Sequence, residues 1–551
     1  MSSCILPRCK DGALQEDRTI VGEAHFRVDH PPFLPQHAPT RKLVCLILLL
    51  VAATQDGRCQ STSAAVNGTV RDQSGAVVPE ATVVFTNVNT RVQHVTATGS
   101  SGDYSLEDIS PGNYFAQAIK NGFVIEEKQG IVLQVNQTAA LDFVLTIGSR
   151  KETITVVSNL SVVDSTTSEL GTAINTQFVA DLPLNGRNFT QLLDLTPGIS
   201  PVSVAQNSTG GTGFGGLAIG SFSFPAVNGQ RNRSNMFLLD GSNDLAFLGN
   251  YNYAPIIDDI QEFKIQSNND LAEFGGVSGG IVNVATKAGT NRFHGSAWEF
   301  LRNEQLDARD YFLPTRNPLR QNQFGVTMGG PILVPHVYNG RTGTFFFFAY
   351  EGFRQSQRAQ TITRAPTAAE LTGNFSSLLS QGIQLYNPFS TRPDPANPGE
   401  FIRDVFSGDI ISPSLLSSAA QLYATTLFPP AGTPVPGGNL YDTTPANLNQ
   451  DSFTARIDQN FGTHDSLFGR VSYLSESSNA TAGYPGALSQ VLINGWNVSV
   501  HESHTFGPGS ILDLHFGRNL GYDTLQTVFP HAGPAPRHRQ PAPPELPPRC
   551  A

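Results

Sequence analysis

The sequence is poor in charge, in methionine and tryptophan, and in long apolar runs, and these shortages exclude several classes of protein. Charged residues make up 15% of the 551 residues, with a net charge of −10, whereas an average soluble domain carries roughly 25% charged residues. The acidic balance argues against a nucleic-acid partner, which would need a basic face. A hydrophobic fraction of 39% is too low for a bundle of membrane helices. The plentiful Gly (52) and Pro (37) disfavour long helices, which leaves a multi-domain, β-rich protein of the envelope or extracellular space.

Cysteine is absent from the whole body of the chain. The five cysteines are Cys4, Cys9, Cys45, Cys59 and Cys550, so none lies between residues 60 and 549. A disulfide framework or a structural zinc site in that body is therefore excluded, because both need thiols.

The front of the chain has the pattern of a secretory signal peptide at residues 41–59. Arg41 and Lys42 precede the apolar run 43–53, which is followed by the polar stretch 54–58. This run is too short to span a membrane as a helix. The alternative is a short buried helix. Residues 1–40 show no periodicity, and we expect an unstructured segment from a start codon assigned too early. No second long apolar run follows, so any membrane-spanning part must be a barrel.

Residues 66–147 predict a small β-sandwich. Strand-like runs at 66–70, 81–85 and 113–118 are separated by turn residues at 72–75, 101–103 and 111–112. The sequence motifs at 68–72, 75–79, 81–83 and 102–106 resemble the carboxypeptidase regulatory-like domain, which has a carbohydrate-binding-like fold. The resemblance implies a non-catalytic module.

The segment 149–158 contains the charged Glu152 followed by a β-branched run, Thr153, Ile154, Thr155 and Val156. Taken alone, it is a strand former. In front of the next segment, it resembles the box through which TonB-dependent transporters contact their energy-coupling partner, by adding a strand to a sheet edge. The alternatives are the last strand of the sandwich or a linker.

Residues 165–290 contain four sequence motifs that resemble, in the same order, those of the plug domain of TonB-dependent outer-membrane receptors of the Oar-like branch. They lie at 182–198, 227–231, 237–241 and 273–289. The resemblance implies an α+β plug. In it, Arg187, Arg231, Arg233 and Asp240 are either plug–barrel ion pairs or ligand contacts, and polar filling of the lumen is the commoner use.

From residue 292 to 529 the pattern is that of antiparallel transmembrane strands. Apolar and polar residues alternate at 453–458, 467–473 and 512–516, as a barrel wall with an apolar outer face requires. A soluble sandwich would also alternate. The aromatic run 345–348 is placed by resemblance in the barrel near an interface. Residues 354–450 are rich in Pro, Gly and Ser and predict a long extracellular loop, with local helix at 413–427.

This predicted barrel is incomplete. We count about seven candidate strands between residues 292 and 527, whereas barrels of the resembled family have about 22 strands. The Pro/Arg-rich residues 530–551 are expected to be a disordered tail and resemble out-of-frame translation. We therefore expect that this chain alone cannot insert as a working transporter.

Three patterns that suggest enzymes or metal sites have simpler explanations. The hydrolase-like pattern around Ser278 is followed by β-branched residues rather than by a helix. The glycines at 211–216 lack the strand and helix of a dinucleotide site. His501 and His504 would point to opposite faces of a strand. We therefore predict no enzyme, no catalytic or metal-binding residue and no cofactor.

The sequence thus predicts a mainly β protein made of a sandwich, a plug and an incomplete barrel. The resemblance implies a TonB-dependent transporter or receptor in the outer membrane of a diderm bacterium, surrounded by lipid. It would take up an unidentified substrate, such as a carbohydrate or a siderophore, with energy from a TonB-type protein of the inner membrane. The alternative is a surface-organising or adhesion protein whose sandwich binds carbohydrate.

Overall fold

The structure is a computed structural model that describes residues 62–148, 153–157, 170–182, 184, 187–200, 225–230, 234–245, 252–268, 274–309, 315–316, 318–427, 438–481, 488–507 and 510–528. The predicted signal peptide, the segment before it and the predicted tail lie outside these residues. So do the glycines at 211–216. Among the helices of the described ranges, none combines the length and the apolar character needed to cross a bilayer.

The first described domain is a two-sheet sandwich. One sheet contains β1 (Ala64–Asp72), β4 (Asp103–Ile109), β7 (Thr138–Ala140) and β8 (Phe143–Leu145); the other contains β2 (Thr82–Asn87), β3 (Gln93–Ala97), β5 (Gly112–Ile119), β6 (Ile125–Leu133) and β9 (Thr153–Val157). Alternate residues of both sheets, such as Val66, Val83, Phe85 and Tyr114, form one buried apolar core. The sandwich expected from the alternation is confirmed.

The segment predicted to be the plug, for which we keep that name, is a five-stranded sheet with short helices. Its strand order is β10 (Leu170–Asn175), β15 (Ile260–Asn268), β16 (Ile281–Thr286), β13 (Met236–Leu239) and β14 (Ser242–Asn243), with α2 (Thr176–Asp181), η2 (Phe189–Leu195), η3 (Ile257–Asp259) and the small pair β11 (Ile199–Ser200) and β12 (Ala226–Val227) beside it. The Asn175 side chain caps α2 by accepting hydrogen bonds from the backbone N–H groups of Gln177 and Phe178. The α+β character predicted for the plug is confirmed.

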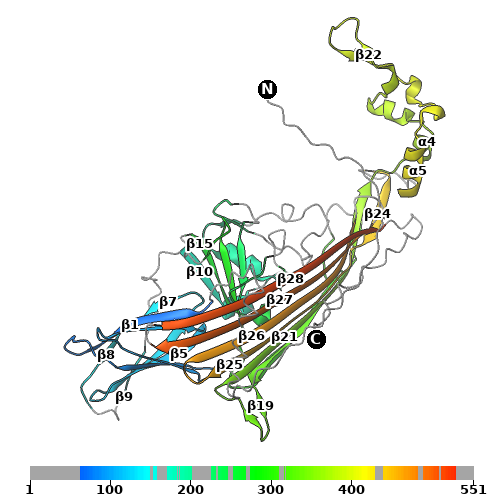
Figure 1. Ribbon diagram of the computed structural model, residues 1–551. Coiled ribbons are helices and arrows are strands. Elements are labelled where there is room, and N and C mark those ends of the chain that lie inside the picture. Colours follow the sequence, from blue (N-terminus) through cyan, green and yellow to red (C-terminus); the bar gives the residue numbers. More distant parts are fainter. Residues whose placement is uncertain are drawn as a thin grey trace, which may run out of the picture. The chain divides into compact units, whose positions relative to one another are not determined.

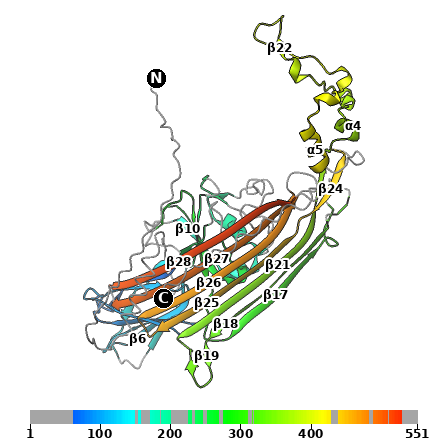
Figure 2. The same ribbon diagram turned by 45° about the vertical axis from the view of Figure 1, so that its right-hand side comes forward.

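The third part is a sheet of long antiparallel strands. Its order is β17 (His294–Asn303), β18 (Leu319–Pro331), β21 (Thr344–Thr363), β25 (Leu448–Phe461), β26 (Asp465–Thr481), β27 (Leu488–Gly507) and β28 (Ser510–Val528); β24 (Leu440–Pro445) also pairs with β21, and a small hairpin joins β19 (Leu333–Val334) to β20 (Tyr338–Asn339). Figures 1 and 2 show these strands side by side in one curved sheet. The sheet does not close on itself within the described residues, because β17 and β28 are its two edges.

In this sheet, polar residues are buried and apolar residues are exposed, which is the reverse of the burial in a soluble protein. On β27 the buried residues include Asn497, Ser499 and His501, while the outward Val500 is 40% exposed. On β26 the buried Arg470 alternates with Gly469 and Val471 of the other face. An apolar outer face and a polar inner face are what a membrane barrel requires and what a soluble sandwich forbids.

The long loop predicted at 354–450 was drawn too wide. Strand β21 continues to Thr363, β24 begins at Leu440 and β25 begins at Leu448. The strand extensions are polar, so they lack the apolar alternation that marks the membrane-spanning part. The segment between β21 and β24 holds α4 (Ala368–Leu371), η4 (Ser376–Gln381), η5 (Pro388–Ser390), β22 (Arg392–Pro393), β23 (Phe401–Ile402), η6 (Ser407–Asp409), η7 (Pro413–Leu415) and α5 (Ser418–Leu427). These elements lie beyond the ends of β21 and β24 (Figures 1 and 2), and the helix predicted at 413–427 is confirmed.

Candidate functional site

A two-residue hairpin carries the central charge of the plug. Strand β13 ends at Leu239 and β14 begins at Ser242, so Asp240 and Gly241 form the turn. Both residues have positive φ angles, 47° and 74°, which is the backbone that Asp-Gly hairpin turns adopt. The turn presents the Asp240 carboxylate to the inner face of the long-stranded sheet, where its side chain is 1% exposed.

Two arginines of the sheet hold this carboxylate. Arg470 Nε donates to Asp240 Oδ2 at 2.7 Å, and Arg456 Nη1 donates to Oδ1 at 3.3 Å. Thr286 of the plug adds its backbone N–H at 2.8 Å and its hydroxyl at 2.7 Å. Every charge in the cluster therefore has an opposite partner, which a buried charge requires.

The network continues along the inner face through Asn497. Arg470 Nη2 donates to Asn497 Oδ1 at 2.7 Å, and Asn497 Nδ2 donates to Asp244 Oδ1 of the plug at 3.1 Å. Nearby, the hydroxyls of Tyr253 and Thr454 lie 2.9 Å apart and join plug to sheet. Plug and sheet thus meet through polar groups as well as through the apolar core that Leu474, Val491 and Ile493 share with the plug.

The buried acids of the plug differ in pKa because their charged partners and hydrogen bonds differ. Burial alone would raise the pKa of Asp240, but Arg456, Arg470 and the Thr286 hydrogen bonds hold it below the usual value. Burial raises the pKa of Asp244 well above its usual value. Burial also raises the pKa of Asp259 to about 7.

A second ion pair joins plug to sheet at Arg187. Its guanidinium pairs with Asp258 of the plug, and its Nε lies 3.4 Å from Glu351 Oε2 of β21. The same guanidinium lies over the rings of Trp298 and Phe300, 5.3 Å and 4.8 Å from their centroids.

Ion pairing was one of the two readings that the sequence left open for Arg187 and Asp240, and the structure confirms it. Arg231 and Arg233 lie outside the described residues. The sequence did not identify Arg456 and Arg470 as partners of Asp240, since they lie 216 and 230 positions away. Only the alternation on their strands, which placed both on the polar face, pointed toward the lumen.

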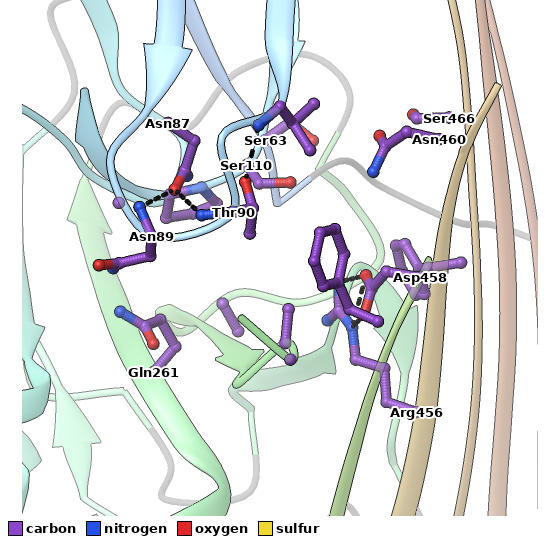
Figure 3. A pocket seen from close by; sticks show the side chains of 18 of the residues that line it. Ser63, Asn87, Asn89, Thr90, Ser110, Gln261, Arg456, Asp458, Asn460 and Ser466 are labelled. Carbon is purple, nitrogen blue, oxygen red and sulfur yellow. Dashed lines mark hydrogen bonds and ion pairs between the residues drawn. The ribbon is translucent and has the colours of Figure 1, made fainter. Parts of the chain in front are cut away.

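A polar cavity of about 160 Å³ opens beside this network (Figure 3). Figure 3 shows Asn87, Asn89 and Thr90 of the sandwich on one side and the Arg456–Asp458 ion pair of β25 on another. His501 and Asp108 also line it.

The predicted energy-coupling segment is an edge strand. Strand β9 pairs in parallel with β6, from Ile125 opposite Thr153 to Gln129 opposite Val157. No strand of the described residues pairs with its other side. Ile154 is 46% exposed and Thr155 is also exposed. Glu152 lies outside the described residues, and for Thr153 and Val156 only the backbone is described.

The other singled-out motifs take ordinary structural places. Ser278 lies in a bend that leads directly into β16, and Cβ atoms at Gly279 and Gly280 would fall 2.3 Å from Asn235 Oδ1 and 2.9 Å from the Gln266 carbonyl. The glycines therefore serve close packing in the plug. His501 is buried on the inner face, whereas His504 pairs with Asp465 at 2.5 Å.

Comparison with known proteins agrees with this architecture. Residues 285–541 match the outer membrane beta barrel domain, and residues 65–146 match the carboxypeptidase regulatory-like domain. The barrel match thus covers residues 530–541, more than half of the segment that we expected to be a tail. The chain therefore carries an outer membrane beta barrel domain and, in front of it, a carboxypeptidase regulatory-like domain.

It is a homologue of the TonB-dependent transporter Oar of Myxococcus xanthus. The two are 26% identical over 321 residues, which cover 54% of this chain and 28% of Oar. The chain thus spans less than a third of that relative's length.

Solved structures give weaker likenesses. The outer membrane transporter YddB from Escherichia coli is 9% identical, with a TM-score of 0.37 over 64% of this chain and 38% of that one. The ferric enterobactin receptor PfeA from Pseudomonas aeruginosa is 10% identical, with a TM-score of 0.31 over 65% of this chain and 47% of that one. By name, Oar, YddB and PfeA are transporters or receptors and not enzymes.

Proposed function

We propose that the chain acts, as part of a complete barrel, in TonB-dependent uptake through the outer membrane, with the plug as the movable gate of the lumen. The observation that carries the proposal is the polar, ion-paired contact of Asp240 with Arg456 and Arg470. Water entering behind a displaced plug could solvate these groups. A fully apolar seal would instead expose hydrocarbon to water at about 25 cal/mol per Å².

The proposed coupling handle is β9. An edge strand with an open side can accept a strand of a TonB-type partner without first leaving its own sheet. The exposed Ile154 and Thr155 give the segment side chains that a partner could contact. Because β9 lies directly before the plug in sequence, a pull on it reaches β10 through the connecting segment.

The proposed cargo is a polar solute from outside the cell, with a carbohydrate and a siderophore as the two classes to test. The inner face beside the plug is polar and includes Asp458, Asn460 and Ser466 at the cavity. The sandwich offers little support for the adhesion alternative. The rings of Phe85, Tyr104 and Phe143 are buried in the core and cannot stack on a sugar, while Phe115 and Phe123 are partly exposed.

Site-specific cross-linking tests the coupling step. The described body contains no cysteine, so Thr155→Cys in a background with Cys59 and Cys550 changed to Ser gives one reactive thiol on the described part. We expect it to form a disulfide with a cysteine placed in the host's TonB-type protein. The matched control is Val144→Cys, which is exposed on the sandwich but lies on the other sheet.

A proline substitution tests the same step by function. Ile154→Pro removes a backbone donor from a strand, and in a full-length parent with a complete barrel we expect it to abolish substrate uptake while surface abundance is unchanged. Uptake at the wild-type rate, or equal cross-linking at residues 144 and 155, would reject β9 as the coupling segment.

A further inference from the structure

Two histidines and an aspartate meet on the inner face of the last two described strands. His501 on β27 is directly opposite His515 on β28 in the strand register. Their rings stack, with centroids 3.7 Å apart and planes at 21°. Asp513 lies two residues before His515 and therefore on the same face. Its Oδ1 is 2.5 Å from His501 Nε2 and 3.0 Å from His515 Nε2.

The hydrogen bonding of this cluster is incomplete. Both imidazoles approach the same carboxylate oxygen of Asp513. The His515 side chain is only 9% exposed, yet neither of its ring nitrogens has a hydrogen bond of acceptable geometry within the described ranges. Buried polar nitrogens are nearly always satisfied, so an unsatisfied one needs an explanation.

A bound cation would explain why the ring nitrogens of His515 lack hydrogen bonds in the described part of the chain. The three donor atoms all lie within 4.8 Å of one another, and zinc binds imidazole nitrogen and carboxylate oxygen at about 2.0–2.2 Å. Small side-chain rotations would thus bring all three onto one ion. A fourth donor atom is near, because Asp108 Oδ1 at the end of β4 lies 3.7 Å from His501 Nε2.

We propose that His501, Asp513 and His515 form a binding site for a divalent first-row transition-metal cation, with zinc as the reference ion. Imidazole and carboxylate ligands suit zinc, cobalt, nickel and copper, whereas magnesium and calcium prefer oxygen-only sites. The site departs from the expectation that the chain has no metal ligand. The site arises because the strand register places His501 opposite His515. His504, which we considered together with His501 on sequence grounds, takes no part in it.

The location gives the cation a structural consequence. It would join β27 to β28 on the inner face and lie at the wall of the polar cavity that His501 and Asp108 line. With Asp108 as a fourth ligand, the same ion would fasten the sandwich to the sheet. Binding would release a proton from each imidazole that holds one, as metal binding to histidine does. The site does not depend on the proposed transport function.

Metal titration of the whole chain in detergent, free of any histidine tag, tests the proposal. Cobalt is added first, because its visible absorption reports the ligand set, and zinc is then used to displace it. We expect one cobalt per chain with nitrogen and oxygen ligands, and displacement by zinc. His515→Gln and His501→Gln should each weaken zinc binding at least tenfold.

The matched control is His504→Gln. His504 belongs to the same strand and also pairs with an aspartate, Asp465, but no second histidine is opposite it. It should leave zinc affinity unchanged, and Asp108→Asn should weaken it less than His515→Gln does. Glutamine preserves size and polarity, and far-UV circular dichroism checks the fold of each variant. Equal affinity in wild-type, His515→Gln and His504→Gln proteins, or no stoichiometric binding by the folded wild type, would overturn the proposal.

Discussion

The sandwich and the long-stranded sheet share a two-residue alternation of apolar and polar side chains, but they bury opposite faces. In the sandwich, Val83 and Phe85 are fully buried. In the sheet, Leu512 and Leu514 are each 42% exposed, while Arg470 on the other face is 1% exposed. Alternation therefore fixes which residues share a face, but the solvent decides which face is inside. In the sheet, the apolar face contacts lipid instead of a protein core, and the polar face contacts the plug instead of bulk water.

The largest expected effect comes from breaking the charge network on the inner face. Arg470→Leu would leave Asp240 with the longer Arg456 contact and the two Thr286 hydrogen bonds, and would remove the donor to Asn497 Oδ1. We expect a loss of about 3–5 kcal/mol in the free energy of unfolding, because a buried carboxylate loses its partner. Denaturant unfolding in detergent micelles measures it. Arg320→Leu, at an exposed position of β18, should change stability by less than about 0.5 kcal/mol, and equal losses would refute the network's role.

The next effect concerns pH and the plug. Asp259 has a pKa of about 7 when folded, above the value of about 3.9 in an unfolded chain. Between these values the unfolded form is ionised while the folded form keeps its proton, so stability falls as pH rises. We expect Asp259→Asn to remove a decline of about 2 kcal/mol between pH 5 and pH 7. Unfolding curves at pH 5, 6 and 7 compare the two proteins, and parallel pH profiles would contradict this assignment.

A matched pair of valines tests the two exposed surfaces directly. Val500 on β27 and Val132 on β6 are 40% and 51% exposed. In lipid vesicles, Val500→Asp should lower stability by about 1–2 kcal/mol, because an acid on the lipid face costs somewhat less than the 2–4 kcal/mol of a central arginine. Val132→Asp faces water and should cost almost nothing. The comparison fails if the two variants behave alike.

The smallest effect is expected inside the sandwich. The Tyr104 hydroxyl donates to the Leu141 carbonyl at 2.6 Å in a buried site. Tyr104→Phe removes one neutral hydrogen bond, so we expect a loss of about 1 kcal/mol. Thermal unfolding followed by circular dichroism measures it. A loss as large as that of Arg470→Leu would show that the sandwich, too, depends on a polar network.

The sequence predicted local features well where they depend on neighbours in the chain. The alternation at 453–458, 467–473 and 512–516 identified β25, β26 and β28 and the faces of their residues. It failed where a strand is polar on both faces, as at the end of β21, because no apolar period remains to be read. Arg354 and Gln355 there still pair with β25.

The site was predictable only in part. Asp240 and Arg187 drew attention through their motifs, but their partners lie on strands far along the chain. The His501–His515 pair depends on the register of β27 against β28, and a shift of one residue would put one of the two on the other face. Sequence patterns do not specify that register.

We infer that the outer face of the long-stranded sheet touches lipid while the inner face touches the plug. The chain has two tryptophans, and they lie on opposite faces. Trp496 packs with Phe453 and Tyr473 on the outer face, as aromatic residues of a membrane girdle do. Trp298 packs against the plug's Ile256 and below Arg187.

Quenching by brominated phospholipids distinguishes the two tryptophans in vesicles. Trp298→Phe leaves Trp496 as the only emitter, and we expect brominated lipid to quench its fluorescence strongly. Trp496→Phe leaves Trp298, which should be quenched little. Equal quenching of the two single-tryptophan proteins, or stronger quenching of Trp298, would contradict this assignment of the two faces.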